Sequence, residues 1–293
     1  MGNARWLAVL LVLIGASSYG LLSPVIKTAY NAGWSGMQIT SSQMSMGALV
    51  LWVLVIGQRK AWSNPFKGPW IQLSLIGILG LAMCTVLYNM ALSELDATVA
   101  IVLLFQFTWM TIAMEAIITR TWPRRNQWLA VAIIMLGTLL SVEVFQADWS
   151  RFTVKGLWLG LGSAAAYSFF LYMTGRILTP MHPLMKSAVM LTSALPLLYL
   201  TYPPVAFVQP GAGSLILWGL LIGTLGQVIP SITFMIGIPR IGSSLAAMLG
   251  AMELPVGIVA SLFILGETVH IGQWFGMLLI LAGMFLAEKK ETS

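Results

Sequence analysis

The sequence predicts an all-α membrane protein with ten transmembrane helices arranged as two inverted five-helix repeats. Three observations lead to this prediction: the chain is 58% hydrophobic and only 8% charged, its apolar segments have the length of membrane spans, and its second half repeats its first. An average soluble domain has roughly 25% charged residues. Backbone groups in lipid must bond within the protein, and the alternating pattern of barrel strands is not seen, so the spans are predicted to be helices.

Ten mainly apolar segments are bounded by Gly, Pro, Asn or charged residues, and a helix of about 20 such residues crosses a bilayer. They cover approximately residues 5–24, 37–57, 70–92, 98–119, 126–144, 155–176, 184–202, 213–236, 242–264 and 271–288. The first segment, with Arg5 ahead of a short apolar core, also resembles a secretory signal peptide. Because its apolar run continues through Val25 and Ile26 and the repeat requires it, we predict a membrane helix there.

Positive residues are distributed unequally between the two sides that ten spans define. Of the 15 Lys and Arg residues, only Lys27, Arg151 and Lys155 fall on one side; the others, including Lys289 and Lys290, fall on the opposite side. Since Lys and Arg mark the cytoplasmic face, we expect both termini in the cytoplasm and a multi-pass protein of the cell membrane. The formal charge of +6 is spread over loops without long basic runs, so no nucleic-acid partner is expected.

A shift of 146 residues places the second half of the chain on the first. The matched positions are Gly77 with Gly223, Gly80 with Gly226, Gln127-Trp128 with Gln273-Trp274, Gly137 with Gly283 and, at a shift of 148, Tyr19 with Tyr167. Five is an odd number of spans, so the second copy enters the membrane from the side opposite to the first. Inverted repeats of this kind are typical of transporters that open alternately to the two sides. The predicted units are residues 5–144, with helices 1–5, and residues 155–288, with helices 6–10.

The segment ELPVGIVASLFILGETVHIGQWFGMLLILAGMFL, residues 253–286, resembles the EamA-type repeat of the drug/metabolite transporter superfamily. The residues that carry this resemblance are Pro255, Leu265-Gly266-Glu267, Gln273, Gly276 and Gly283. The first half departs from the pattern, with Trp109 in place of the Pro and Arg120-Thr121 in place of Gly-Glu. The resemblance covers nearly the whole chain, about 8–141 and 156–287. It implies a central cavity lined mainly by helices 1, 3, 4, 6, 8 and 9, and movement of small solutes, often outward.

Glu253 lies at the centre of the ninth predicted span, where a charged side chain costs at least about 2.5–3.5 kcal/mol. The face it shares with Ala246, Gly250, Gly257 and Ala260 is otherwise made of small residues, which suit either close packing or a cavity wall. Two interpretations are open: Glu253 binds a cationic group of the substrate or takes up a coupling proton, or it is a neutral, hydrogen-bonded structural residue.

Three prolines within predicted spans, Pro24, Pro230 and Pro255, are expected to kink their helices. Since proline has no N–H, we expect the carbonyl of Ala251, four residues before Pro255, to lose its helical partner. A protonated Glu253 could donate to such a carbonyl. Helices broken near the midplane are common in transporters, although static kinks are common as well.

Other polar and aromatic residues at a similar depth complete the candidate substrate-binding site. They are Tyr19, Gln106, Trp109, Tyr167, Gln227 and Ser231. Aromatic walls with a few placed polar groups are typical of small-molecule sites, and ordinary helix packing is the alternative for the three aromatic residues. Glu115, nearer the cytoplasm, is expected to form a structural or gating pair with Arg120 or a basic loop residue.

The predicted function is transport of a small organic solute (an amino acid, a metabolite or a drug-like amine) by alternating access through a central cavity, with export expected. The alternative is a non-transporting receptor or lipid-handling scaffold on the same fold. An enzyme is not expected, since Asp96 and Asp148 lie at predicted span ends and His182 and His270 lie in loops. The only cysteine is Cys84 and no Cys/His cluster has metal spacing, so neither a metal nor a cofactor is expected.

Overall fold

The computed structural model describes residues 2–208 and 212–288, and this part of the chain is all-helical, without β-strands. Nine helices within it are long and apolar enough to cross a membrane. They are Ala4–Asn31, Gly36–Gly57, Trp70–Glu94, Ala97–Thr119, Val154–Arg176, Pro183–Thr201, Ala212–Ile241, Ser243–Leu265 and Ile271–Glu288. The fifth predicted span forms the helix Arg125–Ser141, which with 17 residues is too short to be counted among the nine. Lys289 and Lys290 lie outside the described residues.

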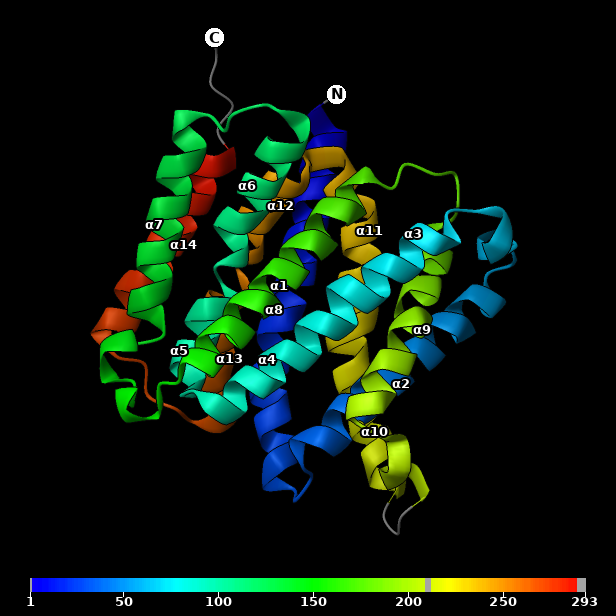
Figure 1. Ribbon diagram of the computed structural model, residues 1–293, viewed down its shortest axis with the longest axis horizontal. Helices are drawn as coiled ribbons and strands as arrows, with labels where there is room; N and C mark the ends of the chain where they lie inside the picture. The colour runs from blue at the N-terminus through cyan, green and yellow to red at the C-terminus, as the bar shows by residue number, and fades with distance from the viewer. Residues whose placement is uncertain (1, 209–211, 289–293) are drawn as a thin grey trace.

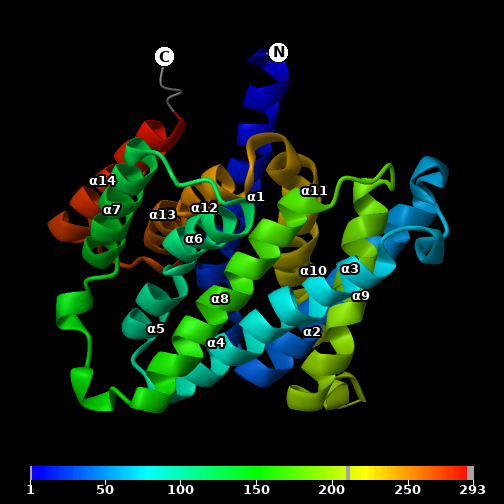
Figure 2. The ribbon, with the colours of Figure 1, turned by 45° about the horizontal axis from the view of Figure 1, so that its top comes forward.

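Several spans are divided into shorter helices, which Figures 1 and 2 label separately. The helices are α1 (Gly2–Asn31), α2 (Gly36–Gly57), α3 (Trp70–Leu75), α4 (Met83–Glu94), α5 (Ala97–Leu104), α6 (Phe107–Thr119), α7 (Arg125–Ser141), α8 (Val154–Arg176), α9 (Pro183–Thr201), α10 (Ala212–Gly223), α11 (Ile229–Ile241), α12 (Ser243–Gly250), α13 (Glu253–Leu265) and α14 (Ile271–Glu288). Two π-helical segments, Ile76–Ala82 and Thr224–Val228, join α3 to α4 and α10 to α11. The 3₁₀ turns Arg59–Ala61, Pro65–Lys67, Val144–Gln146, Trp149–Arg151 and Pro204–Val208 lie between spans.

Polar residues set the beginnings of several helices. The Ser35 side chain accepts from the Gln38 N–H while the Gln38 side chain accepts from the Ser35 N–H, which is a capping box at the start of α2. Thr153 caps α8 and Asp96 caps α5 in the same way, through side-chain oxygens that accept backbone N–H groups.

Two predicted boundaries are wrong because prolines do not end these helices. α1 runs past Pro24 to Asn31, and α11 includes Pro239 and ends at Ile241. Proline is tolerated inside membrane helices where side chains and neighbouring helices satisfy the backbone groups it leaves free.

Small residues let neighbouring helices approach closely. α7 and α14 lie side by side (Figure 1), and a Cβ atom at Gly137 would stand 2.7 Å from the carbonyl oxygen of Gly276. α1 packs against α11, α12 and α13 within the bundle. Such small-residue contacts are the usual basis of helix packing in membranes, and they explain the repeated glycines near positions 137 and 283.

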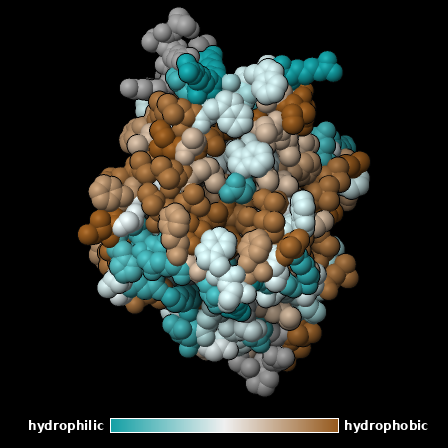
Figure 3. All heavy atoms as spheres, turned by 60° about the vertical axis from the view of Figure 1, so that its left-hand side comes forward, coloured by the Kyte–Doolittle hydropathy of each residue, from teal (hydrophilic) through white to brown (hydrophobic). Residues whose placement is uncertain are grey.

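The outer surface of the bundle is apolar over a wide area. Large hydrophobic side chains such as Ile117, Leu200 and Phe285 are more than three-quarters exposed. Figure 3 shows brown, hydrophobic side chains across the middle of one face, with hydrophilic side chains gathered toward its two ends. Soluble monomers rarely expose apolar patches larger than a few hundred Å², so this surface fits a lipid environment.

Ion pairs mark the two ends of the bundle. Arg5 and Glu288 are joined at 3.4 Å at one end, which we call the Arg5 end. Lys27 pairs with Glu267 at the opposite end, which we call the Lys27 end. The partner of Lys27 is thus the Glu of the Leu-Gly-Glu motif.

The same backbone interruption occurs twice, 146 residues apart, in Ala97–Thr119 and in Ser243–Leu265, which are the fourth and ninth of the ten predicted spans and keep those numbers below. Between α5 and α6, the Gln106 N–H donates to the Leu103 carbonyl at 3.2 Å. Between α12 and α13, the Met252 N–H donates to the Leu249 carbonyl at 3.1 Å. These three-residue bonds replace the four-residue bonds of an α-helix. The two π-helical segments likewise occupy corresponding stretches of the two halves.

Candidate functional site

Glu253 is the first residue of α13, immediately after the break in the ninth span. The N-terminus of a helix presents free backbone N–H groups and the positive end of the helix dipole. A carboxyl group in the first turn is therefore in a favourable electrostatic position, although it lies within a membrane span. The break creates this position, because an unbroken helix has no dipole end at that depth; the N–H groups of Met252, Leu254 and Val256 are themselves bonded to carbonyl groups across the break.

No other described side chain forms a hydrogen bond or ion pair with the Glu253 carboxyl group. The carboxyl group is close enough to interact electrostatically with four side chains: the hydroxyl groups of Tyr19, Tyr88 and Tyr167 and the thiol of Cys84. All five side chains are surrounded by protein and yet remain partly accessible. Space that a water-sized molecule can enter therefore reaches them. We call the region lined by these five residues the central chamber.

The chamber is framed by a continuous series of aromatic contacts. The ring centroids of Tyr19 and Phe234 are 6.0 Å apart, those of Phe234 and Phe170 6.3 Å, and those of Phe170 and Tyr167 5.6 Å. The Tyr167 ring also meets Phe107 edge-on, at 4.7 Å. The rings come from α1, α11, α8 and α6, so they join elements from the two ends of the chain into one wall.

Known proteins resemble this chain along its whole length. The family model described as the EamA-like transporter family matches residues 6–143 and again residues 154–288. The chain belongs to the EamA-like transporter family. It is therefore a membrane transporter with multiple spans. Transporters of this family are not enzymes.

Two individual proteins place this EamA-like transporter among its relatives. An uncharacterized transporter of Synechocystis sp. (strain ATCC 27184 / PCC 6803 / Kazusa) is 21% identical over 320 residues, which cover 100% of this chain and 96% of that protein. A crystal structure of another protein superposes with a TM-score of 0.76 at 17% identity, over 97% of this chain and 98% of the other. The second likeness shows that the fold is shared.

The predicted site residues of this EamA-like transporter fall into three groups. Tyr19, Tyr167 and Glu253 meet at the central chamber. Gln227 and Ser231 are buried, but Ser231 donates to the Gln227 carbonyl within their own span, and Gln227 packs against Gly47 of α2. Neither forms a hydrogen bond with a residue of the chamber in the described part of the chain.

Gln106 and Trp109 form a local pair on the fourth span. The Trp109 indole N–H donates to the Gln106 side-chain oxygen at 2.8 Å, and the Gln106 amide donates to the Val102 carbonyl at 2.9 Å. Both ends of the amide are satisfied by their own span, and Trp109 is 36% exposed. Neither side chain forms a hydrogen bond with Glu253 in the described part of the chain.

Sequence reasoning missed Tyr88 and Cys84 of the chamber and Phe107 of its aromatic wall. Tyr88 lies 146 residues before Phe234, and Phe107 lies 146 residues before Glu253. The shift that paired the glycines would have paired these residues as well, had it been applied to every aromatic position. Cys84 was considered from the sequence as a possible metal ligand and not as a chamber residue.

Two further expectations concerning polar partners are wrong. The Ala251 carbonyl is not free, because the tight turn of the break brings the Leu254 N–H within 3.3 Å of it. Glu115 does not pair with Arg120 or another basic residue: its carboxylate accepts from the Ser243 hydroxyl and from the Ser244 N–H, both at 3.0 Å. The start of α12 lies beside α6, and this placement provides closer donors than the basic loop does.

The two aspartates that bear on an enzymatic alternative serve structural roles. Asp96 accepts from the Thr98 N–H at 2.8 Å. Asp148 accepts from the Ser150 hydroxyl at 2.5 Å and from the Ser150 N–H at 3.0 Å. The bond from the Ser150 hydroxyl, and to a smaller extent the bond from the Ser150 N–H, hold the pKa of Asp148 below its usual range.

Proposed function

We propose that this protein carries a small organic solute with an amino group, such as an amino acid, a metabolite or a drug-like amine, outward across the membrane through the central chamber. The observation that supports this proposal is the carboxyl group of Glu253, which faces accessible space and has no protein partner among the described residues. An ionised carboxylate at this depth requires a compensating positive charge. A substrate ammonium group would supply that charge.

The aromatic wall favours the same class of solute. The faces of Tyr rings attract organic cations, by about 0.5–2 kcal/mol for each well-placed contact. Tyr19 and Tyr167 lie near Glu253 on helices from different halves of the chain. A proton is the simplest alternative partner for the carboxylate, so the exchange of an amine for a proton at Glu253 would couple transport to a proton gradient.

The proposed transport cycle uses two inverted five-helix halves, residues 5–144 and 155–288, and ten spans. Its support is the recurrence of the helix break and of the π-helical segment after about 146 residues. α7, with 17 residues, is within the length range of a membrane helix. With positive residues concentrated on one side, both termini would lie in the cytoplasm. Alternating access then exposes the chamber first to one face and then to the other.

Three ligands with a similar carbon skeleton test this proposal: phenethylamine, phenylalanine and phenylpropionate, which carry an amine, a zwitterion and an anion. Thermal stabilisation of the purified protein in nanodiscs is expected with the first two ligands and not with the third. Stabilisation by phenylpropionate alone would contradict a cation-binding role of Glu253.

Flux in sealed vesicles separates transport from simple binding. We expect labelled amine to cross the membrane faster than in protein-free vesicles, and to accumulate when a pH gradient is imposed. A ligand that binds in nanodiscs but never crosses the vesicle membrane would instead favour a receptor or scaffold.

A further inference from the structure

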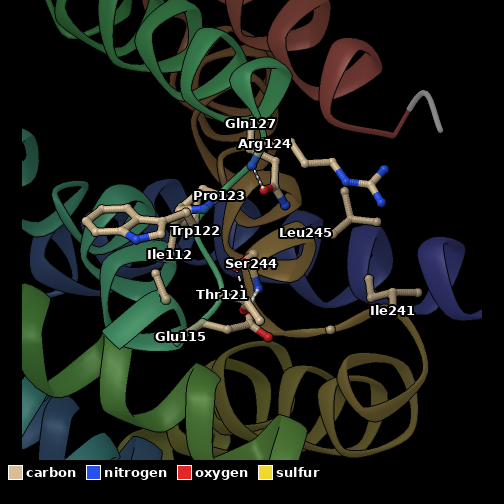
Figure 4. A pocket seen from close by; sticks show the side chains of 12 residues that line it. Ile112, Glu115, Thr121, Trp122, Pro123, Arg124, Gln127, Ile241, Ser244 and Leu245 are labelled. Atoms are coloured by element: carbon tan, nitrogen blue, oxygen red, sulfur yellow. Dashed lines mark hydrogen bonds between the residues drawn. The ribbon is translucent and has the colours of Figure 1, made fainter. Parts of the chain in front are cut away.

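Glu115 on α6 caps the first turn of α12, a helix of the other half of the chain. Its carboxylate accepts from the Ser243 hydroxyl, the Ser244 N–H and the Ser244 hydroxyl. Figure 4 shows Glu115 and Ser244 side by side at this junction. A carboxylate that accepts the free N–H groups of a first turn stabilises that helix. We call this set of bonds the Glu115 clasp.

The corresponding helix of the first half is capped in a different way. α5 begins after Asp96, whose own carboxylate accepts from the Thr98 N–H at 2.8 Å. The residue 146 positions later is Gly242, which has no side chain to offer and a φ of 89°. α12 therefore lacks a cap of its own and receives one from α6. Ser261 is the residue 146 positions after Glu115, and its side chain has no hydrogen-bond partner in the described part of the chain.

The clasp is positioned between the central chamber and the Arg5 end. α6 packs directly against α12, and both figures of the ribbon place these helices together near that end. α12 is separated by the break at 251–252 from α13, whose first residue is Glu253. A movement of α12 away from α6 would therefore open a way to Glu253 without unfolding α13.

Solvent can reach the clasp. A pocket of about 310 Å³ at this junction is lined by Glu115, Thr121, Trp122, Arg124, Gln127 and Ser244, among others. Glu115 itself is half-buried. Water in the pocket can replace the bonds of the clasp when the helices separate, so the contact is suited to repeated breaking and re-forming.

We propose that the Glu115 clasp is the gate that closes the central chamber at the Arg5 end. While the clasp is intact, α6 and α12 are held together and solute reaches Glu253 only from the Lys27 end. When the clasp breaks, the chamber opens at the Arg5 end. This inference rests on the proposed transport function, because a gate has meaning only if solute passes the chamber.

Cys84, the only cysteine, provides a native reporter inside the chamber. The test measures the rate at which a membrane-impermeant methanethiosulfonate modifies Cys84 in sealed vesicles of known orientation, with the reagent added to one side at a time. An N-terminal tag identifies the Arg5 side. Glu115→Ala is expected to raise the rate from the Arg5 side about tenfold, because loss of a charged helix cap shifts the closed state by roughly that factor.

Further variants separate the clasp from general damage. Ser244→Ala should raise the same rate by a smaller factor, and should add little in the Glu115→Ala background because both changes remove one contact. Glu115→Gln, which can still accept from the Ser244 N–H, should give an intermediate rate. The matched control is Glu94→Gln, which removes a carboxylate that pairs with Lys155 at the Lys27 end and should leave the rate from the Arg5 side unchanged.

The outcomes distinguish the gate from the chamber. If Cys84 reacts from the Lys27 side in every variant and Glu115→Ala does not increase its reaction from the Arg5 side, the gate is wrong and the transport proposal stands. If Cys84 reacts from neither side in any variant, there is no solvent-filled chamber, and both proposals are wrong. An equal increase in Glu94→Gln would also contradict the gate, because the effect would then be unspecific.

Discussion

The fourth and ninth spans have the same backbone but differ in chemistry. In both, the chain breaks at corresponding positions and resumes as a helix, with Thr108 N–H donating to the Phe105 carbonyl in one and Leu254 N–H donating to the Ala251 carbonyl in the other. The first residue after the break is Phe107 in the fourth span and Glu253 in the ninth. One architecture therefore holds an apolar ring at one position and a carboxyl group at its counterpart.

The surroundings of these two residues show what the difference means. Phe107 is only 1% exposed and is packed edge-on against Tyr167. Glu253 is partly accessible and has no partner among the described residues. The first half thus provides a packed wall and the second half provides the only acidic side chain of the chamber. Corresponding positions of the two segments that match the family model therefore carry different chemistry.

The largest effect is expected from Glu253→Gln, which makes the ninth span neutral like the fourth. A hydrogen-bonded ion pair between the carboxylate and an amine contributes about 1.5–3 kcal/mol, so amine binding should weaken about ten- to hundredfold. Vesicle flux of labelled amine and its dependence on a pH gradient measure the change. Glu143→Gln is the control, since it removes a carboxylate near His270 at the Lys27 end. Unchanged flux and pH dependence in Glu253→Gln would exclude both the amine and the proton roles.

A second variant tests how closely the ninth span is held by α1. A Cβ atom at Gly20 would stand 2.5 Å from the carbonyl oxygen of Glu253, which as a backbone atom cannot move aside. Gly20→Ala should therefore lower the free energy of unfolding by about 1–3 kcal/mol. Gly57→Ala is the matched control, because its Cβ would meet nothing within 4 Å. Equal thermal stability of the two variants in detergent would contradict a close contact between Gly20 and the Glu253 carbonyl.

Pro255 marks the most visible sequence difference between the breaks, yet a smaller effect is expected from it. The Ala251 carbonyl already accepts from Leu254, and the fourth span breaks in the same way with Trp109 at the proline position. Pro255→Ala should therefore change stability by less than about 1 kcal/mol and leave amine flux within about twofold. Melting temperature and vesicle flux measure both. A tenfold loss of flux would mean that the proline itself maintains the break.

A similarly small effect on stability, and none on the site, is expected at the ends of the two spans, where each carries one residue in the left-handed conformation. It is Arg120 in the first half, with φ of 55°, and Gly266 in the second, with φ of 69°. Arg120→Gly should raise stability by up to about 1 kcal/mol, because glycine adopts this conformation without strain. Gly266→Ala should lower it by a similar amount. Thermal unfolding of the two variants measures both changes. A less stable Arg120→Gly variant together with a more stable Gly266→Ala variant would contradict this prediction.

Much of the helical architecture could be predicted because it depends on composition and periodicity. Apolar segments of about 20 residues have few alternatives in lipid, and the 146-residue shift located the corresponding glycines. Glu253 stood out because a carboxyl group among apolar residues is costly. The ends of α1 and α11 could not be predicted, because whether a proline ends a membrane helix depends on the groups that surround it.

The site was less predictable than the fold because its contacts join distant segments. Gln106 has the polarity of a cavity residue, but its own neighbours, Val102 and Trp109, satisfy it. Glu115 has an arginine five residues away, but its partners are 128 and 129 residues away in the sequence. Hydrogen-bond partners depend on which helices pack together, and helix packing cannot be deduced from a single sequence.

The π-helical segment Ile76–Ala82 sets the direction in which α4 presents its side chains. Such a segment contains one residue more than the α-helical path would need. If all of its residues wound as a regular α-helix, the extra residue would rotate the following helix by about 100°. Cys84 and Tyr88 would then face a different side of the helix, away from Glu253, although the span would remain long enough to cross the bilayer. The phase of a helix, as much as its amino-acid content, determines which surface receives the reactive groups.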